Sequence, residues 1–124
     1  MEPTTGHLPI QPTAEQYRSV FADILSQAVT GELVGMANFA SMVDVHDDIH
    51  EKMSAIEHAR SEKSHAEAFL RASEQLGVRV IVDMKAPYWH RVREAFLRRV
   101  ETRDLSEQTP PPYLSWKRSP VAQP

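Results

Sequence analysis

Residues 55–69 read AIEHARSEKSHAEAF and place an acid and a histidine inside a helical pattern. Five positions in this stretch follow steps of four and three residues and so share one face of an α-helix: Ala55, Ala59, Glu62, Ala66 and Phe69. His65 lies three residues after Glu62, so a helix brings the two side chains next to each other. A buried carboxylate must be neutral, hydrogen-bonded, paired with a cation or bound to a metal. The stretch therefore predicts a long helix with a polar site on its buried face.

The ends of this helix are marked by turn and capping residues. The preceding segment DVHDD, residues 44–48, reads as a turn. Asp48 and Glu51 form a capping-box pattern with an acidic first turn, which suits the positive end of a helix dipole. Gly77 is a good residue for the position just beyond the last helical residue. We expect a helix from about Ile49 to Leu76.

A second long helix is predicted before the turn, from Ala14 to about Val45. Thr13 and Gln16 fit a capping box at its start. Six apolar positions recur at three- and four-residue steps and form an inward stripe: Leu25, Ala28, Val29, Met36, Phe39 and Val43. Glu32 lies within this stripe. Because the turn is short, the two helices must form an antiparallel hairpin.

The remainder of the chain predicts a third helix and a tail. Val78, Val80, Ile81 and Val82 are β-branched but have no partner strand, so we expect an extended connector packed against the hairpin. Pro87 fits the first turn of a helix from Tyr88 to about Arg103. Its core-facing residues should be Trp89, Val92, Phe96 and Val100. The predicted organisation is a flexible leader at 1–12, a helical domain at 13–105 and a proline-rich disordered tail at 106–124.

Composition excludes several classes of function. The net charge of -3 gives no basis for binding nucleic acid, because no basic excess replaces phosphate counterions. The absence of cysteine excludes disulfides, thiolate metal sites and cysteine nucleophiles, so a metal must be held by oxygen and nitrogen ligands. No signal peptide is recognised, and uninterrupted apolar runs are short, so we expect no membrane span and a cytoplasmic location.

Glu32, Glu62 and His65 together predict half of a dimetal site. Glu32 lies about fourteen residues before the turn and the other two about fifteen to eighteen after it, so a rise of about 1.5 Å per residue puts them at similar heights. A Glu on one helix and Glu-x-x-His on its neighbour is the half-site of bundle-type carboxylate dimetal centres. Such ligands suit iron or manganese. In the alternative interpretation the helix phases differ, and both acids are solvated or paired with Arg60 and Lys63.

Other charged groups have simpler explanations. His58 and Glu57 could orient a metal ligand by hydrogen bonding, but we expect them on the surface. The acidic and histidine-rich run at 46–51 fits helix capping in a hydrated loop. A set of arginines on the third helix fits a solvated face: Arg91, Arg93, Arg98, Arg99 and Arg103. We expect Met36, Phe39, Met53 and Phe69 to be ordinary core residues.

From Tyr17 to about Leu105 the chain resembles the ferritin-like dimetal-carboxylate proteins. It is most similar to the N-terminal half of the cyanobacterial aldehyde-deformylating oxygenase group, through Gly31-Glu32, residues 62–65 (EKSH) and residues 88–96 (YWHRVREAF). The resemblance implies an all-α, ferritin-like helical hairpin plus a third helix, an incomplete four-helix bundle. It also implies a di-iron, oxygen-dependent oxidoreductase with a hydrophobic acyl or aldehyde substrate. In that family later helices supply further ligands, whereas here Glu107 is the last acid and His90 the last histidine, a pattern expected of a truncated reading frame.

The half-site also resembles that of the encapsulated ferritins, in which short helical hairpins complete one another across a dimer interface. Phe39 stands where an aromatic residue follows the first Glu in that group. This resemblance implies a homo-oligomer whose two-fold axis brings two copies of Glu32, Glu62 and His65 together. Two other functions stay open: a ferroxidase-type iron-binding protein, and a metal-free helical interaction or dimerisation module.

Overall fold

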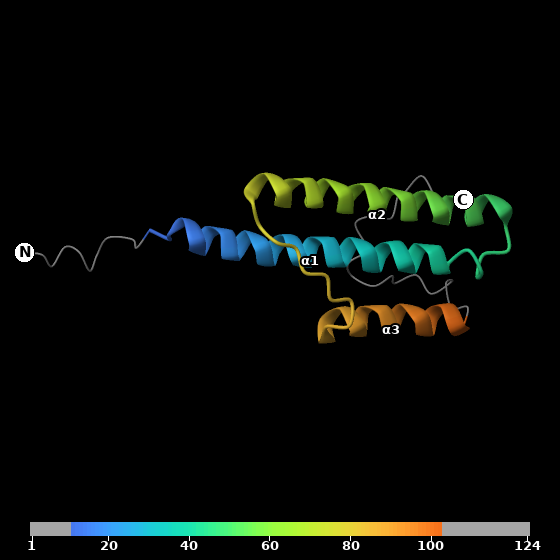
Figure 1. Cartoon of the computed structure of the whole chain (residues 1–124). Helices are drawn as coiled ribbons and strands as arrows, with labels where there is room; N and C mark the ends of the chain where they lie inside the picture. Colours follow the sequence, from blue (N-terminus) through green and yellow to red (C-terminus); the bar gives the residue numbers. More distant parts are fainter. Residues whose placement is uncertain (1–10, 103–124) are drawn as a thin grey trace, which may run out of the picture.

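The computed structural model describes residues 11–102, and this part of the chain folds into three α-helices without a β-strand (Figure 1). Helix α1 spans Ala14–Ser41, α2 spans Ile49–Leu76 and α3 spans Pro87–Thr102. The predicted all-α class is confirmed. Most of the expected leader, and all of the expected tail, lie outside the described residues.

Helix α1 begins at the predicted capping box. The backbone N–H of Gln16 donates to Oγ1 of Thr13 at 3.1 Å, and the N–H of Thr13 donates to Oε1 of Gln16 at 2.7 Å. The helix ends at Ser41, before the predicted Val45. After Ser41 the N–H groups of the turn donate to carbonyls three residues back, as from Val45 to Met42 at 3.1 Å. This tighter spacing ends the helix because the chain is already reversing direction toward α2.

Helix α2 has the predicted bounds. Oδ2 of Asp48 accepts the N–H of Glu51 at 3.0 Å at its start. At its end Gly77 adopts a φ of 66°, in the left-handed region that favours glycine. The N–H of Val78 then donates to the carbonyl of Ser73 at 2.9 Å, which satisfies one of the last free carbonyls of the helix.

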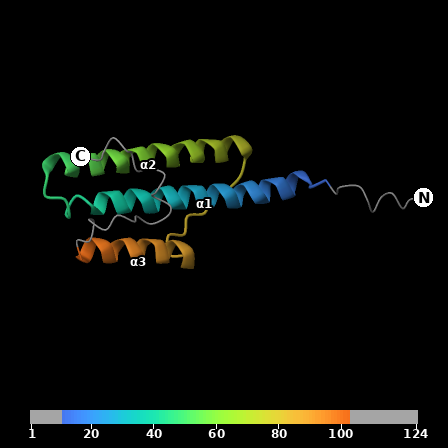
Figure 2. The same cartoon turned by 180° about the vertical axis from the view of Figure 1, so that it is seen from behind.

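Helix α1 is the central helix of the three. It packs against α2 on one side and against α3 on the other, while α2 and α3 have no direct backbone contact (Figure 1; Figure 2). Figure 2 shows the antiparallel hairpin of α1 and α2 from behind, with α3 along the half of α1 nearest the turn. The N-terminal half of α1 extends past α3 and is left without this neighbour.

A small core forms where all three helices meet, near the hairpin turn. It consists of Phe39 from α1, Ala59 from α2 and Phe96 from α3. Met36, Met42 and Val100 pack against it and are partly buried. Phe96 is the buried residue of α3, whereas the other residues predicted to face the core there, Trp89, Val92 and Val100, are half-buried. Met53, predicted as a core residue, is instead 60% exposed, because the buried face of this turn of α2 is formed by Ala55.

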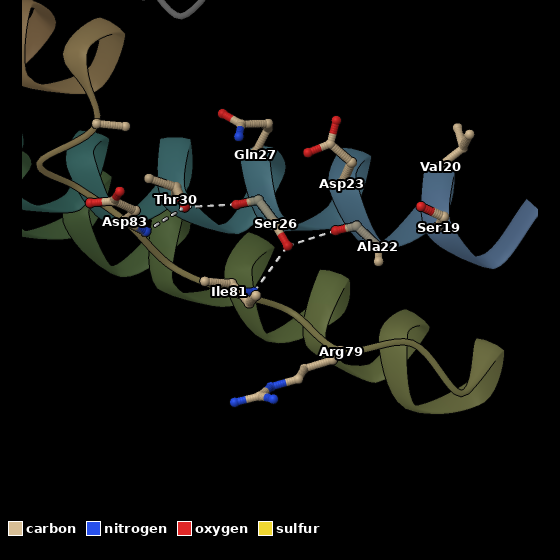
Figure 3. A pocket seen from close by; sticks show the side chains of 11 residues that line it. Ser19, Val20, Ala22, Asp23, Ser26, Gln27, Thr30, Arg79, Ile81 and Asp83 are labelled. Atoms are coloured by element: carbon tan, nitrogen blue, oxygen red, sulfur yellow. Dashed lines mark hydrogen bonds between the residues drawn. The ribbon is translucent and has the colours of Figure 1, made fainter. Parts of the chain in front are cut away.

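The segment between α2 and α3 is the extended connector that the sequence predicted. Its backbone is fastened to two hydroxyl groups of α1, as Figure 3 shows. The N–H of Ile81 donates to Oγ of Ser26 at 3.0 Å, and the N–H of Asp83 donates to Oγ1 of Thr30 at 3.4 Å. These contacts explain why a strand is unnecessary, since side chains of α1 accept the hydrogen bonds that a partner strand would accept.

Helix α1 is long and apolar enough to cross a membrane by length and composition alone. This differs from the sequence expectation, which relied on uninterrupted apolar runs. The core helix of a soluble protein passes the same test, and a third of this apolar stretch of α1 is buried among the three helices.

Candidate metal centre

Glu62 lies in the seam between α1 and α2. Its side chain is 3% exposed, and its neighbours on the same face of α2 are the buried residues Ala59 and Ala66. Across the seam the carboxylate lies against Gly35 of α1. The small residues on both helices leave room for a carboxylate inside the interface, as the pattern of residues 55–69 predicted.

Glu32 and His65 reach the same point from opposite sides of the seam. Nδ1 of His65 lies 3.3 Å from Oε1 of Glu32 and 3.4 Å from Oε1 of Glu62. The Glu32 side chain is 18% exposed and the His65 side chain is 44% exposed. Burial therefore decreases from Glu62 outward to His65, so the cluster opens to the surface at the histidine.

The three side chains fit a metal ion. Each offers one ligand atom, and these atoms lie within 4.8 Å of one another. Metal–ligand bonds of about 2.0–2.2 Å place neighbouring ligands of one ion roughly 3.0–3.5 Å apart, according to whether the geometry is octahedral or tetrahedral. The Nδ1–Oε1 distances of 3.3 and 3.4 Å agree with this spacing and are also those of a hydrogen bond between His65 and Glu32 and an ion-pair contact between His65 and Glu62. The three ligand atoms together spread up to 4.8 Å, so the side chains would draw closer around an ion. Two carboxylates and one imidazole are also a suitable donor set for iron, manganese or zinc.

The alternative pairing of the acids with nearby cations is wrong. Arg60 instead forms an ion pair with Glu57, at 3.5 Å between Nη1 and Oε2. Lys63 pairs with Glu67 at 3.1 Å between Nζ and Oε2. Both pairs lie on the exposed surface of α2, where each of the four side chains is 49–68% exposed.

The remaining histidines and acids near the hairpin do not gather into a second cluster of this kind within residues 11–102. The His58 ring is stacked on the Phe39 ring at 4.8 Å between centroids. His46 forms an ion pair with Glu51 at 2.9 Å. His58 is exposed and stacks on the core residue Phe39, as expected of a surface residue. The turn residues Asp48 and His46 contact Glu51 in the first turn of α2, in agreement with the interpretation of this run as helix capping.

Two functional features escaped the sequence analysis. Gly35 could be expected from the sequence only to weaken the helix and allow close packing, yet it lies directly against the Glu62 carboxylate. Arg93 was assigned to a solvated face, but its Nη1 donates to Oδ1 of the fully buried Asn38 at 2.6 Å. A signal for Arg93 was present, because it lies four residues after Trp89 and three before Phe96, on the core-facing stripe of α3.

A cavity of about 540 Å³ lies away from the carboxylate cluster, between α1 and the connector (Figure 3). Asp23 and Arg79 contribute to its wall but point in different directions. The hydroxyls of Ser26 and Thr30, which also line it, already hold the connector. The polar groups of this cavity do not converge on one ligand position.

Comparisons of the chain with protein-family models, with curated proteins and with solved structures found no match. The geometry of Glu32, Glu62 and His65 is therefore the basis for assigning a function.

Proposed function

We propose that this protein binds iron through Glu32, Glu62 and His65, as one half of a ferritin-like dimetal-carboxylate centre. The observation that carries the proposal is the convergence of three ligand atoms within 4.8 Å, from two helices, around a carboxylate that is 3% exposed. Nδ1 of His65 lies within 3.4 Å of an oxygen of each carboxylate, and one metal ion would take all three groups as ligands. Manganese would suit the same ligands.

A second copy of the chain would complete the centre. Bundle-type dimetal sites use two further carboxylates and a second histidine, in addition to the set that one hairpin supplies. An isologous two-fold contact would bring these ligands from the partner and place both half-sites in one interface. His65 is the open edge of the cluster, so the second copy would approach over this side of the seam.

Within the paired site each side chain would have its own role. Glu62, the most buried side chain, would be the inner ligand of the metal ions, and Glu32 and His65 would be terminal ligands. The small residues around Glu62 would exclude water and hold its carboxylate in one orientation. Bound reduced iron would supply electrons to dioxygen, which makes the protein an oxygen-dependent oxidoreductase. A hydrophobic acyl or aldehyde substrate is proposed on the family resemblance alone.

The test is the rate of iron oxidation. Metal-free protein is loaded with Fe(II) without oxygen and mixed with oxygenated buffer, and ferric absorbance is followed with time. Wild-type protein should oxidise Fe(II) faster than buffer, and Glu62→Ala should match buffer. Glu57→Ala removes an exposed acid that is paired with Arg60 and should behave as wild type. A wild-type rate equal to that of buffer would exclude a ferroxidase, and no dioxygen consumption above buffer after addition of a long-chain aldehyde and an electron donor would exclude the oxidoreductase function altogether.

The same experiment separates two variants of this function. A ferroxidase oxidises Fe(II) rapidly without any organic compound. An oxygenase would instead consume dioxygen, together with electrons from an added donor, in proportion to an added long-chain aldehyde and with a matching amount of product.

A metal-free interaction module is the competing function, and the exposed apolar residues of α1 favour it. Val20 and Ile24 are 55% and 54% exposed, on the part of α1 that extends past α3. Such side chains mark a surface that binds another helix. This function predicts that Glu32→Ala leaves stability unchanged or increased, with or without added metal, because a partly buried charge has been removed.

A further inference from the structure

Two glycines lie in the interior of α1, on either side of Glu32. Inside a helix, a glycine in place of an alanine lowers the folding equilibrium constant about fivefold. Gly31 and Gly35 each lie against a side chain of another helix. The close approach of these side chains explains why glycine is tolerated at both positions.

The space beside Gly35 is filled by the Glu62 carboxylate. A Cβ atom built at position 35 would overlap Oε2 of Glu62 and would lie 3.3 Å from its Cδ and 3.6 Å from its Cγ. The Glu62 side chain is 3% exposed, so its carboxylate would have to leave a buried position in the seam to make room for this atom. It could turn outward only past His65, which is the open edge of the cluster.

We propose that Gly35 is a positioning residue for the metal centre. By lacking a side chain it lets the Glu62 carboxylate lie fully inside the seam, where Oε1 of Glu62 comes within 3.4 Å of Nδ1 of His65. A methyl group at position 35 would displace this carboxylate from the position it shares with Glu32 and His65. This inference rests on the proposed metal centre for its function, although the contact itself is independent of any metal.

Gly31 provides a matched control on the same helix. A Cβ atom there would lie 2.8 Å from Cη2 of Trp89, on the side of α1 that faces α3. Gly31→Ala therefore adds the same methyl group to the same helix but displaces an indole ring instead of a metal ligand. It should change Trp89 fluorescence and leave the carboxylate cluster in place.

The first experiment is a titration with Co(II), followed by its d–d absorbance, on full-length protein. Removing a residue that orients a metal ligand typically weakens metal affinity by about 10–100-fold. Gly35→Ala should show a loss of this size, with an unchanged far-UV circular dichroism spectrum. Gly31→Ala should bind Co(II) as wild type does. Wild-type affinity in Gly35→Ala would overturn the inference.

The second experiment needs no metal. The unfolding equilibrium is measured in EDTA for wild type, Gly35→Ala, Glu62→Ala and the double variant. With alanine at position 62 the contact is gone, so Gly35→Ala should raise the folding equilibrium constant about fivefold through helix propensity. With Glu62 present the gain should be smaller or reversed, because the carboxylate must leave its buried position.

If Gly35→Ala changes the folding equilibrium constant equally with Glu62 and with alanine at position 62, the inference is overturned. This holds even if Gly35→Ala loses Co(II) binding, because that loss would not act through the Glu62 side chain. If wild-type protein binds no Co(II), the proposed function fails by itself. The unfolding measurements then decide alone whether Gly35 fixes the position of Glu62.

Discussion

Arg93 fastens α3 to the buried side of α1, and its replacement by alanine should destabilise the protein measurably. Nη1 of Arg93 donates to Oδ1 of Asn38 at 2.6 Å, and Nη2 donates to Oγ of Ser41 at 3.3 Å. Hydrogen bonds from a charged group contribute about 1.5–3 kcal/mol to stability. The bond to Asn38 is short and its acceptor is fully buried, whereas the bond to Ser41 is long. We therefore expect Arg93→Ala to lower the free energy of unfolding by about 2 kcal/mol.

Thermal unfolding followed by circular dichroism measures this loss. For a domain of this size each kcal/mol lowers Tm by roughly 4–8 °C, so Arg93→Ala should lower Tm by roughly 8–16 °C. Arg91→Ala is the matched control, because Arg91 is an exposed arginine of the same helix. An exposed substitution of this kind should stay within about 0.5 kcal/mol of wild type.

A double-mutant cycle ties the effect to Asn38. With Asn38→Leu the acceptor is replaced by an apolar side chain of similar size, and Arg93→Ala should then cost much less than it does in wild type. If Arg93→Ala is no worse than Arg91→Ala, or costs the same with Leu at position 38, the assignment of Arg93 as the anchor of α3 is refuted.

Three further predictions concern other parts of the fold. Gly77→Ala should cost about 1–2 kcal/mol, because alanine is strained at the observed φ of 66°, and thermal unfolding would measure it. Phe96→Ala should lower the free energy of unfolding by about 3–5 kcal/mol, because Phe96 is the buried residue of α3. The loosened helix should also expose Trp89 to water, which a red shift of tryptophan fluorescence would show. Under the competing interaction function, glutamate at both Val20 and Ile24 should lower the mass in sedimentation equilibrium toward that of one chain, because this function covers their exposed apolar surface with another helix; an unchanged mass would contradict that function.

The sequence was sufficient for the helices because their ends are determined locally. Thr13 with Gln16, Asp48 with Glu51, and Gly77 are each recognisable within four residues of the chain, and the structure has all three caps. The end of α1 was predicted too late because it is not determined by local residues. No glycine or proline marks Ser41, and the reversal toward α2 is determined by packing of the hairpin.

The cluster of Glu32, Glu62 and His65 was also predictable, because the periodicity fixes the face and the hairpin fixes the height of each residue. The wall that Gly35 provides was not predictable, since it depends on the distance between the two helix axes. The contact of Arg93 with Asn38 depends on where α3 docks, and a connector of irregular structure does not determine that position. Local patterns thus predict which side chains share a face, while distances between elements require the fold.

The most direct test of the account is the iron content of the assembled protein, measured by native mass spectrometry after loading with Fe(II) without oxygen and desalting. The account predicts a species of two chains with two iron ions, and its loss in Glu62→Ala and His65→Ala but not in Glu57→Ala. Wild-type protein that retains no iron, or iron that remains in Glu62→Ala, would contradict the assignment of Glu32, Glu62 and His65 as half of a dimetal centre.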